Sequence, residues 1–114
     1  MTTDELVDEM VRLSHLLDDA LEFLKRQVAE YAAAEDAYRM AHALAFLEAP
    51  GIGPARKAQA DRQTSEQRRR AHLAEGMRQA GLEAVRSRRA QISALQSLLN
   101  VVRAEAEFSR TGPL

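Results

Sequence analysis

The sequence predicts an all-α fold in which two long helices form an antiparallel helical hairpin or coiled coil that self-associates. Three observations lead to this prediction: a heptad repeat in the first half, a composition of helix-forming residues, and one break rich in proline and glycine. Alanine, leucine, glutamate, arginine and glutamine dominate the 114 residues, and aromatic residues make up only 4% of them. This composition is typical of long helices rather than of a thick globular core.

The heptad repeat consists of two interleaved series at alternating spacings of three and four residues. One series contains Met10, Leu17, Leu24, Tyr31, Tyr38 and Ala45, and the other contains Leu6, Leu13, Ala20, Gln27, Ala34 and Ala41. Together they form one stripe along a helix, the pattern of a coiled-coil seam. Such a stripe must be buried against another helix, so the first helix requires a partner.

The first helix is expected over residues 3–49. Thr3 is its predicted N-cap, and Asp4 and Glu5 fall in the first turn, where the helix dipole favours acidic side chains. Two prolines and two glycines at 50–54 interrupt any helix, so this stretch is predicted to be a turn.

The second helix is expected over residues 55–109, ended by Thr111-Gly112-Pro113. Its 3,4 spacing is clean from Ile92 onward and absent between residues 59 and 70. The apolar positions of this half include Leu73, Met77, Ala80, Ala84, Val85, Ile92, Leu95, Leu99, Val102 and Ala106.

An alternative divides the second half into two helices. Thr64 as N-cap and Gln67 three residues later match a capping box. A short helix over 54–62, a kink near Thr64 and a main helix over 65–109 would then replace the single second helix.

The short turn favours an antiparallel hairpin, a single domain over residues 1–114. Its strongest apolar blocks, 6–24 and 92–102, are expected to pair at the open end. One hairpin of this size buries little surface, so we expect a homo-oligomer or docking onto a second, unidentified protein. The predicted protein interface consists of Leu13, Leu17, Leu24, Ile92, Leu95 and Leu99.

Charge is divided unevenly along the chain. Residues 1–53 carry four basic and eleven acidic side chains, a net charge of −7, whereas residues 54–114 carry twelve basic and six acidic ones, a net charge of +6. The favoured interpretation is that the acidic and basic helices pair along the flanks of the seam. The alternative is nucleic-acid contact through an arginine cluster, because arginine suits phosphate. That cluster consists of Arg68, Arg69, Arg70, Arg86, Arg88 and Arg89.

Nucleic-acid binding is the less favoured interpretation, because no aromatic residue lies between Phe46 and Phe108 to stack on bases. We expect no catalytic, cofactor or metal site and no enzyme. His15 and Glu22 share a helix face with neighbouring aspartates, but a solvated acidic face explains them better than a metal half-site. Tyr31 and Tyr38 are expected to pack in the seam, with a partner-binding role as the alternative.

The chain is expected to be cytoplasmic. No run of about 18 apolar residues exists, which argues against a membrane span. The acidic start lacks the basic and apolar regions of a signal peptide, and the chain contains no cysteine.

The stretches from Leu82 to Leu99 and from Glu30 to Arg39 resemble small helical coiled-coil proteins of bacteriophages and prophages of high-GC Gram-positive bacteria. The resemblance implies a cytoplasmic location in the bacterial host and a role near DNA metabolism. We therefore expect a non-enzymatic adaptor or inhibitor of a DNA-replication or recombination protein. Weak, sequence-independent nucleic-acid binding and a structural role in a virion or larger assembly are the alternatives.

Overall fold

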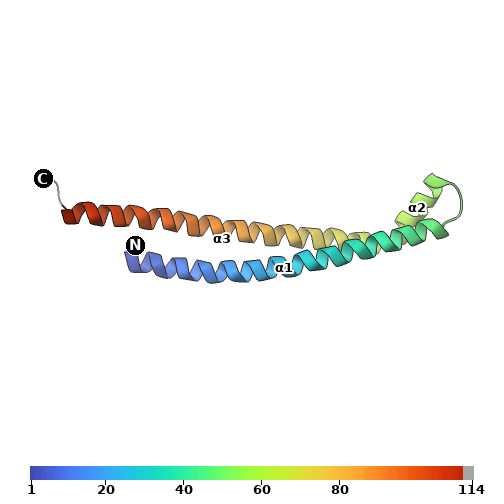
Figure 1. Cartoon of the computed structure of the whole chain (residues 1–114). Helices are drawn as coiled ribbons and strands as arrows, with labels where there is room; N and C mark the ends of the chain where they lie inside the picture. Colours follow the sequence, from blue (N-terminus) through green and yellow to red (C-terminus); the bar gives the residue numbers. More distant parts are fainter. Residues whose placement is uncertain (112–114) are drawn as a thin grey trace. The chain divides into compact units, whose positions relative to one another are not determined.

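In a computed structural model, which describes residues 1–111, the chain is all-α and contains no strand in that range. The three helices described are α1 (Thr3–Glu48), α2 (Gly53–Gln63) and α3 (Ser65–Thr111) (Figure 1). The predicted helical class is confirmed. The predicted Gly112-Pro113 stop signal lies outside the described residues.

Contacts divide the chain into two compact units. Unit 1 contains Met1–Glu22 together with the described residues from Leu82 onward, and unit 2 contains Phe23–Gly81. Each unit therefore combines a segment of α1 with a segment of α3, and unit 2 also contains α2. None of the helices within residues 1–111 has a stretch long and apolar enough to cross a membrane.

The N-cap of α1 is Thr2, not Thr3 as predicted. The Glu5 amide donates a hydrogen bond to the Thr2 hydroxyl oxygen at 3.2 Å, and the Leu6 amide donates to the Thr2 carbonyl at 3.0 Å. Two adjacent threonines offer the same capping chemistry, so composition alone could not decide between them. Asp4 and Glu5 lie in the first turn as predicted.

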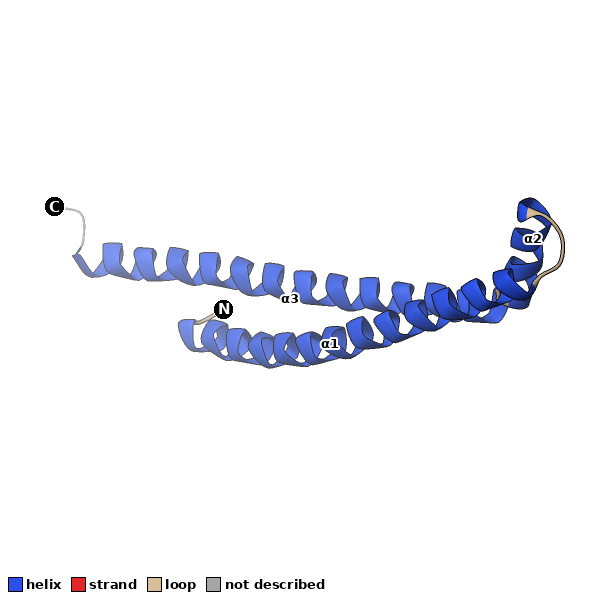
Figure 2. Cartoon of the chain, turned by 45° about the vertical axis from the view of Figure 1, so that its right-hand side comes forward, coloured by secondary structure: helices blue, strands red, loops and turns tan. Residues whose placement is uncertain are grey.

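A loop over residues 49–52, tan in Figure 2, joins α1 to α2. Gly51 turns the chain with a φ of +96°, a conformation that favours glycine. The Arg56 Nε donates to the Ala49 carbonyl at 2.9 Å, and its guanidinium lies 5.7 Å from the centre of the Phe46 ring. The first turn of α2 thereby satisfies a carbonyl left free at the end of α1.

The second half contains two helices rather than the single helix over 55–109, because the chain breaks at Thr64 as the kinked alternative proposed. The predicted capping box does not form. The Thr64 hydroxyl instead donates to the Ala60 carbonyl at 2.7 Å, a bond from residue i to i−4 that bends helices. The side-chain oxygen of Gln67 is buried without a hydrogen-bond partner among residues 1–111.

The heptad stripe of α1 is the buried face of this helix. All twelve positions of the two predicted series are buried or half-buried, with Leu6 fully covered and Leu13 3% exposed. We call this stripe, with the residues of α3 that face it, the seam.

Within unit 2, residues with higher numbers on α1 contact residues with lower numbers on α3. Gly81 faces Leu24, and the Arg78 guanidinium lies over the ring of Tyr31. The two segments are therefore antiparallel. Leu24 thus lies against Gly81 rather than against residues 92–102. The predicted pairing of residues 6–24 with residues 92–102 was therefore wrong at the Leu24 end. Helices with the same rise per residue pair segments of equal length, and the segment 92–102 is shorter than 6–24.

Candidate interaction surfaces

The seam of α3 can be traced from its half-buried and buried positions. Apart from the half-buried Glu75 and Leu82, which directly follow seam positions, they recur at spacings of three and four: Gln67, Ala71, Ala74, Arg78, Gly81, Val85, Arg88, Ile92, Leu95, Leu99 and Val102. From Val85 to Val102 this set matches the predicted apolar positions, apart from the half-buried Arg88, whereas the predicted position Ala106 is exposed. Before Val85 it consists of small and polar residues, which is why the sequence pattern does not reveal it.

The six residues predicted as a protein interface all lie in the seam. Leu13 and Leu99 are each 3% exposed, and the other four are half-buried. Leu13 and Leu95 border the same hollow in unit 1. These side chains are largely covered within the chain, so an interface to another molecule needs additional residues.

Gly81 permits a close approach of α1 and α3 in unit 2. A β-carbon at this position would lie 3.2 Å from Cδ1 of Phe23 and 3.3 Å from the backbone Cα of Leu24. Gly76, by contrast, faces open space. The absence of a side chain at Gly81 therefore sets the local spacing of the helices.

Arg78 is a charged residue inside the seam. Its guanidinium donates to both carboxylate oxygens of Glu75, at 2.6 and 2.9 Å, and lies 5.6 Å from the centre of the Tyr31 ring. The Arg78 hydrogen bonds lower the pKa of Glu75. Both charged side chains are about 30% exposed, so the pair stays charged while its apolar stem packs against the tyrosine.

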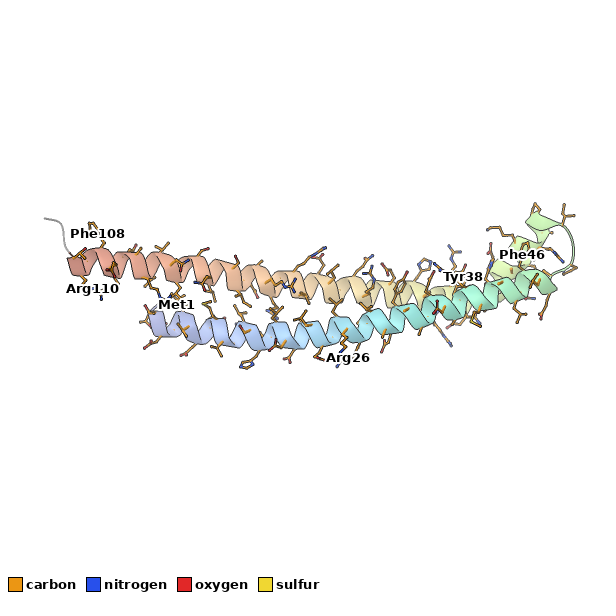
Figure 3. The ribbon with its side chains drawn as sticks, viewed as in Figure 1. Met1, Arg26, Tyr38, Phe46, Phe108 and Arg110 are labelled. Carbon is orange, nitrogen blue, oxygen red and sulfur yellow. The ribbon has the colours of Figure 1, made fainter. Side chains whose placement is uncertain are left out.

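A groove of about 370 Å³ follows one side of the seam in unit 2. Its lining residues are Tyr31, Glu35, Tyr38, Arg68, Ala71, His72 and Glu75. Tyr38, labelled in Figure 3, packs edge-on against His42 with ring centres 5.8 Å apart. Both tyrosines are half-buried, as expected for packing at the edge of the seam. The alternative, a partner-binding role for them, stays a prediction.

The ion pairs differ from the favoured interpretation of the charge division. Among residues 1–111, none joins α1 to α3, and all but one join residues three or four positions apart in one helix. The exception links α1 to α2: His42 Nε2 lies 2.9 Å from Asp61 Oδ1, and Lys57 Nζ lies 3.0 Å from Asp61 Oδ2. Hydrogen bonds from His42 and then from Lys57 lower the pKa of Asp61.

The arginine cluster is not one continuous surface. Arg69 and Arg70 both bind Glu66, whose pKa their hydrogen bonds lower to about 2, with Arg69 the larger cause. Arg86 binds Glu83 at 2.9 Å. Arg88 is half-buried in the seam and donates to Gln91. Of the six residues of this cluster, only Arg68 and Arg89 are exposed without an ion-pair partner within residues 1–111, so a phosphate backbone would find no regular row there.

A second stripe on α3 lies one position before each seam residue from Ala74 to Val102, continues to Phe108 and is exposed throughout. Its members are Leu73, Met77, Ala80, Ala84, Ser87, Gln91, Ala94, Leu98, Val101, Glu105 and Phe108. We call it the outer stripe. Its first four members belong to the predicted apolar positions, but they are exposed rather than buried. An offset of one residue turns them about 100° around the helix, away from α1.

Comparison of the chain with protein-family models, with curated proteins and with solved structures gave no match. The resemblance to phage-encoded helical proteins therefore stays a prediction. The candidate surfaces rest on the geometry of the chain itself.

Proposed function

We propose that the chain is a non-enzymatic helical interaction protein, an adaptor in which α1 and α3 form an antiparallel hairpin with coiled-coil packing. Two observations support the hairpin. The seam positions of both helices recur at 3,4 spacing, and the contacts of unit 2 run in opposite directions along the two helices. Both properties are expected for knobs-into-holes packing of antiparallel helices.

The observation that carries the interaction role is the uncovered end of α3 in unit 1. Figures 1 and 2 show α3 continuing past the start of α1. Every residue from Arg103 to Thr111 is exposed, and the outer stripe supplies Leu98, Val101 and Phe108, which are 44%, 53% and 66% exposed. Phe108 is labelled in this segment in Figure 3. A helix end with an apolar face and no covering helix is suited to binding another helix.

The partner that fits this segment is an amphipathic helix with its own heptad stripe. Residues 103–111 carry two basic and two acidic side chains, so the segment has no net charge with which to select a charged partner. Apolar packing would therefore supply the affinity. A DNA-replication or recombination protein as the source of that helix follows from the sequence resemblance alone and stays a prediction.

The test is binding of a labelled three-heptad peptide with leucine at both core positions, measured by fluorescence anisotropy. We expect the wild-type chain to bind it and Val101→Glu with Phe108→Glu to lose binding at least tenfold. Val11→Glu is the matched control, since Val11 is 52% exposed in unit 1 on α1 and outside the outer stripe. Equal binding by the double variant and the wild type would contradict the proposal.

A further inference from the structure

Apart from Val28 and from Ile52 in the loop, the large exposed apolar side chains of unit 2 lie in two stripes, one on each long helix. Met40, Leu44 and Leu47 of α1 are 75%, 58% and 71% exposed, and Leu73 and Met77 of α3 are 57% and 46% exposed. Exposed alanines extend both stripes. With them, the positions are Ala33, Ala37, Met40, Leu44 and Leu47 on α1, and Leu73, Met77 and Ala80 on α3. We call these eight residues the unit 2 face.

The spacing of this face is that of an unused coiled-coil seam. Both stripes advance by four and three residues in alternation, the period that keeps side chains in line along a helix. A helix face that stays in contact with solvent does not require apolar residues at this spacing. Monomeric proteins seldom expose contiguous apolar patches of this kind. The pattern indicates that other helices cover the face.

Both stripes lie on the same side of the seam. Residues that follow seam positions, such as Glu35 on α1 and His72 on α3, line the groove on one side. Residues that precede seam positions are turned about 200° from these, toward the opposite side. Leu44 borders a hollow on that side together with Gln67. By this helix geometry the two stripes form one two-helix surface, with Leu73 at its outer edge, where it also borders a hollow with His72 and Asp61.

We propose that a second copy of this chain covers the unit 2 face, with its α3 lying over α1 of the first copy and its α1 over α3. Charge supports this occupant and this arrangement. Residues 31–48 of α1 carry one basic and three acidic side chains, a net charge of −2, whereas residues 65–81 of α3 carry four basic and two acidic ones, a net charge of +2. The ion pairs of these segments lie within one helix and none joins α1 to α3 among the described residues, so the net charge of each segment is left uncompensated by the other helix and can act on another copy.

The other two-fold arrangement, with α1 against α1 and α3 against α3, would bring like charges together, which is unfavourable. In the proposed arrangement the two-fold symmetry axis is parallel to the helices. A given residue therefore lies at the same height along this axis in both copies. The groove spans residues 31–38 on α1 and 68–75 on α3, so residue 33 lies level with residue 73. Ala33 of one copy is then expected to face Leu73 of the other.

The first test is the mass of the full chain in solution, by light scattering behind size exclusion and by sedimentation equilibrium. We expect a dimer for the wild type and a monomer for Leu44→Glu with Met77→Glu, with unchanged helicity by circular dichroism because both side chains are exposed. Val28→Glu is the matched control, because Val28 is 47% exposed in unit 2 and follows a seam residue, away from the face. A monomeric wild type, or a double variant that remains dimeric, would overturn the proposal.

A second test does not depend on the folding of those variants. The chain has no cysteine, so a single introduced cysteine is unique. Mixing Ala33→Cys with Leu73→Cys under oxidising conditions should give a disulfide-linked dimer of the two variants. Efficient linkage of Met40→Cys to itself, without linkage in the mixture, would place α1 against α1 and overturn the arrangement.

These tests are separate from the peptide-binding test. The unit 2 face and the end of α3 in unit 1 share no residue. A chain that dimerises but ignores the heptad peptide would retain the second-copy proposal and refute the adaptor role, and the reverse result would refute only the dimer.

Discussion

Two glycines of α3 show how one hydrogen atom in place of a side chain has opposite consequences at two sites. Both lie in the interior of a helix, where glycine is unfavourable relative to alanine. At Gly81 the cost is offset because Phe23 and the Leu24 backbone occupy the space that a β-carbon needs. At Gly76 nothing lies within 4 Å, so no packing contact compensates.

Gly76→Ala should therefore raise the free energy of unfolding by about 0.5–1 kcal/mol, through helix propensity alone. Gly81→Leu should lower it by about 1–3 kcal/mol, because α1 and α3 must separate to admit the side chain. Denaturant unfolding followed by circular dichroism measures both changes. Equal effects of the two substitutions would show that the close approach at Gly81 has no energetic role.

Glu66 makes the stability of α3 depend on pH. Arg69 and Arg70 hold its pKa at about 2, below the ordinary value of 4.5. A carboxylate with a lowered pKa contributes its stabilisation fully above about pH 4.5 and loses it as the pH falls toward 2. Because Glu66 is half exposed, solvent screens the pair and the effect is small.

We expect Glu66→Gln to be less helical than the wild type at neutral pH and to match it near pH 2. Circular dichroism at 222 nm, recorded from pH 7 to pH 2, measures this difference. Glu30→Gln is the control, since no ion pair to Glu30 occurs within the described residues. A difference from the wild type that persisted unchanged to pH 2 would contradict the role given to Glu66.

At the scale of elements, the buried positions of α1 could be predicted from its sequence, whereas those of α3 could be predicted only in part. The two interleaved series of α1 form one stripe, and the buried and half-buried residues include all of the predicted positions. In α3 two stripes lie one residue apart and merge in the sequence, as at Leu98 and Leu99 or Val101 and Val102. Adjacent apolar residues cannot share a helix face, and this was the available signal that α3 has two faces to cover.

The seam before Val85 was not predictable from hydrophobicity, because Arg78 and Gly81 lie in it for reasons of three-dimensional contact. A guanidinium packs there only because Tyr31 and Glu75 surround it, and a glycine only because Leu24 approaches closely. The break at Thr64 was foreseen from its capping chemistry, but the hydroxyl bonds backward to Ala60 instead.

The short helix α2 depends on Arg56, which binds the Ala49 carbonyl and lies over Phe46. Arg56→Ala should lower the free energy of unfolding by about 1–2 kcal/mol, because a hydrogen bond from a charged group and a cation–π contact are lost. Arg62→Ala is the matched control, since Arg62 bonds only the exposed side chain of Gln59. Thermal unfolding measures both, and equal losses would contradict this role of Arg56.

At the scale of the whole molecule, the two units have seams of different composition. The seam of unit 1 contains mostly large aliphatic side chains, including Leu6, Leu13 and Leu99, whereas unit 2 contains Gln27 and several alanines at equivalent positions. Large aliphatic side chains contribute more stabilisation on burial than alanine or glutamine. The intrinsic stability of the chain is therefore expected to be concentrated in unit 1.

Amide hydrogen exchange should reveal this difference. At low protein concentration, residues 27–45 should exchange faster than residues 6–20, because local opening is easier where the seam is thin. At high concentration the difference should shrink, since a second copy would cover the unit 2 face. Exchange rates that did not vary with concentration would contradict dimerisation through this face.

The one-residue offset between the seam and the outer stripe also determines how many helices can assemble. On α3, two stripes about 100° apart face two neighbours in nearly perpendicular directions. A helix at the corner of a square needs two faces about 90° apart, close to the angle between these stripes, whereas a helix at the corner of a triangle needs faces about 60° apart. A second apolar stripe shifted by one residue from the seam would thus favour a four-helix bundle.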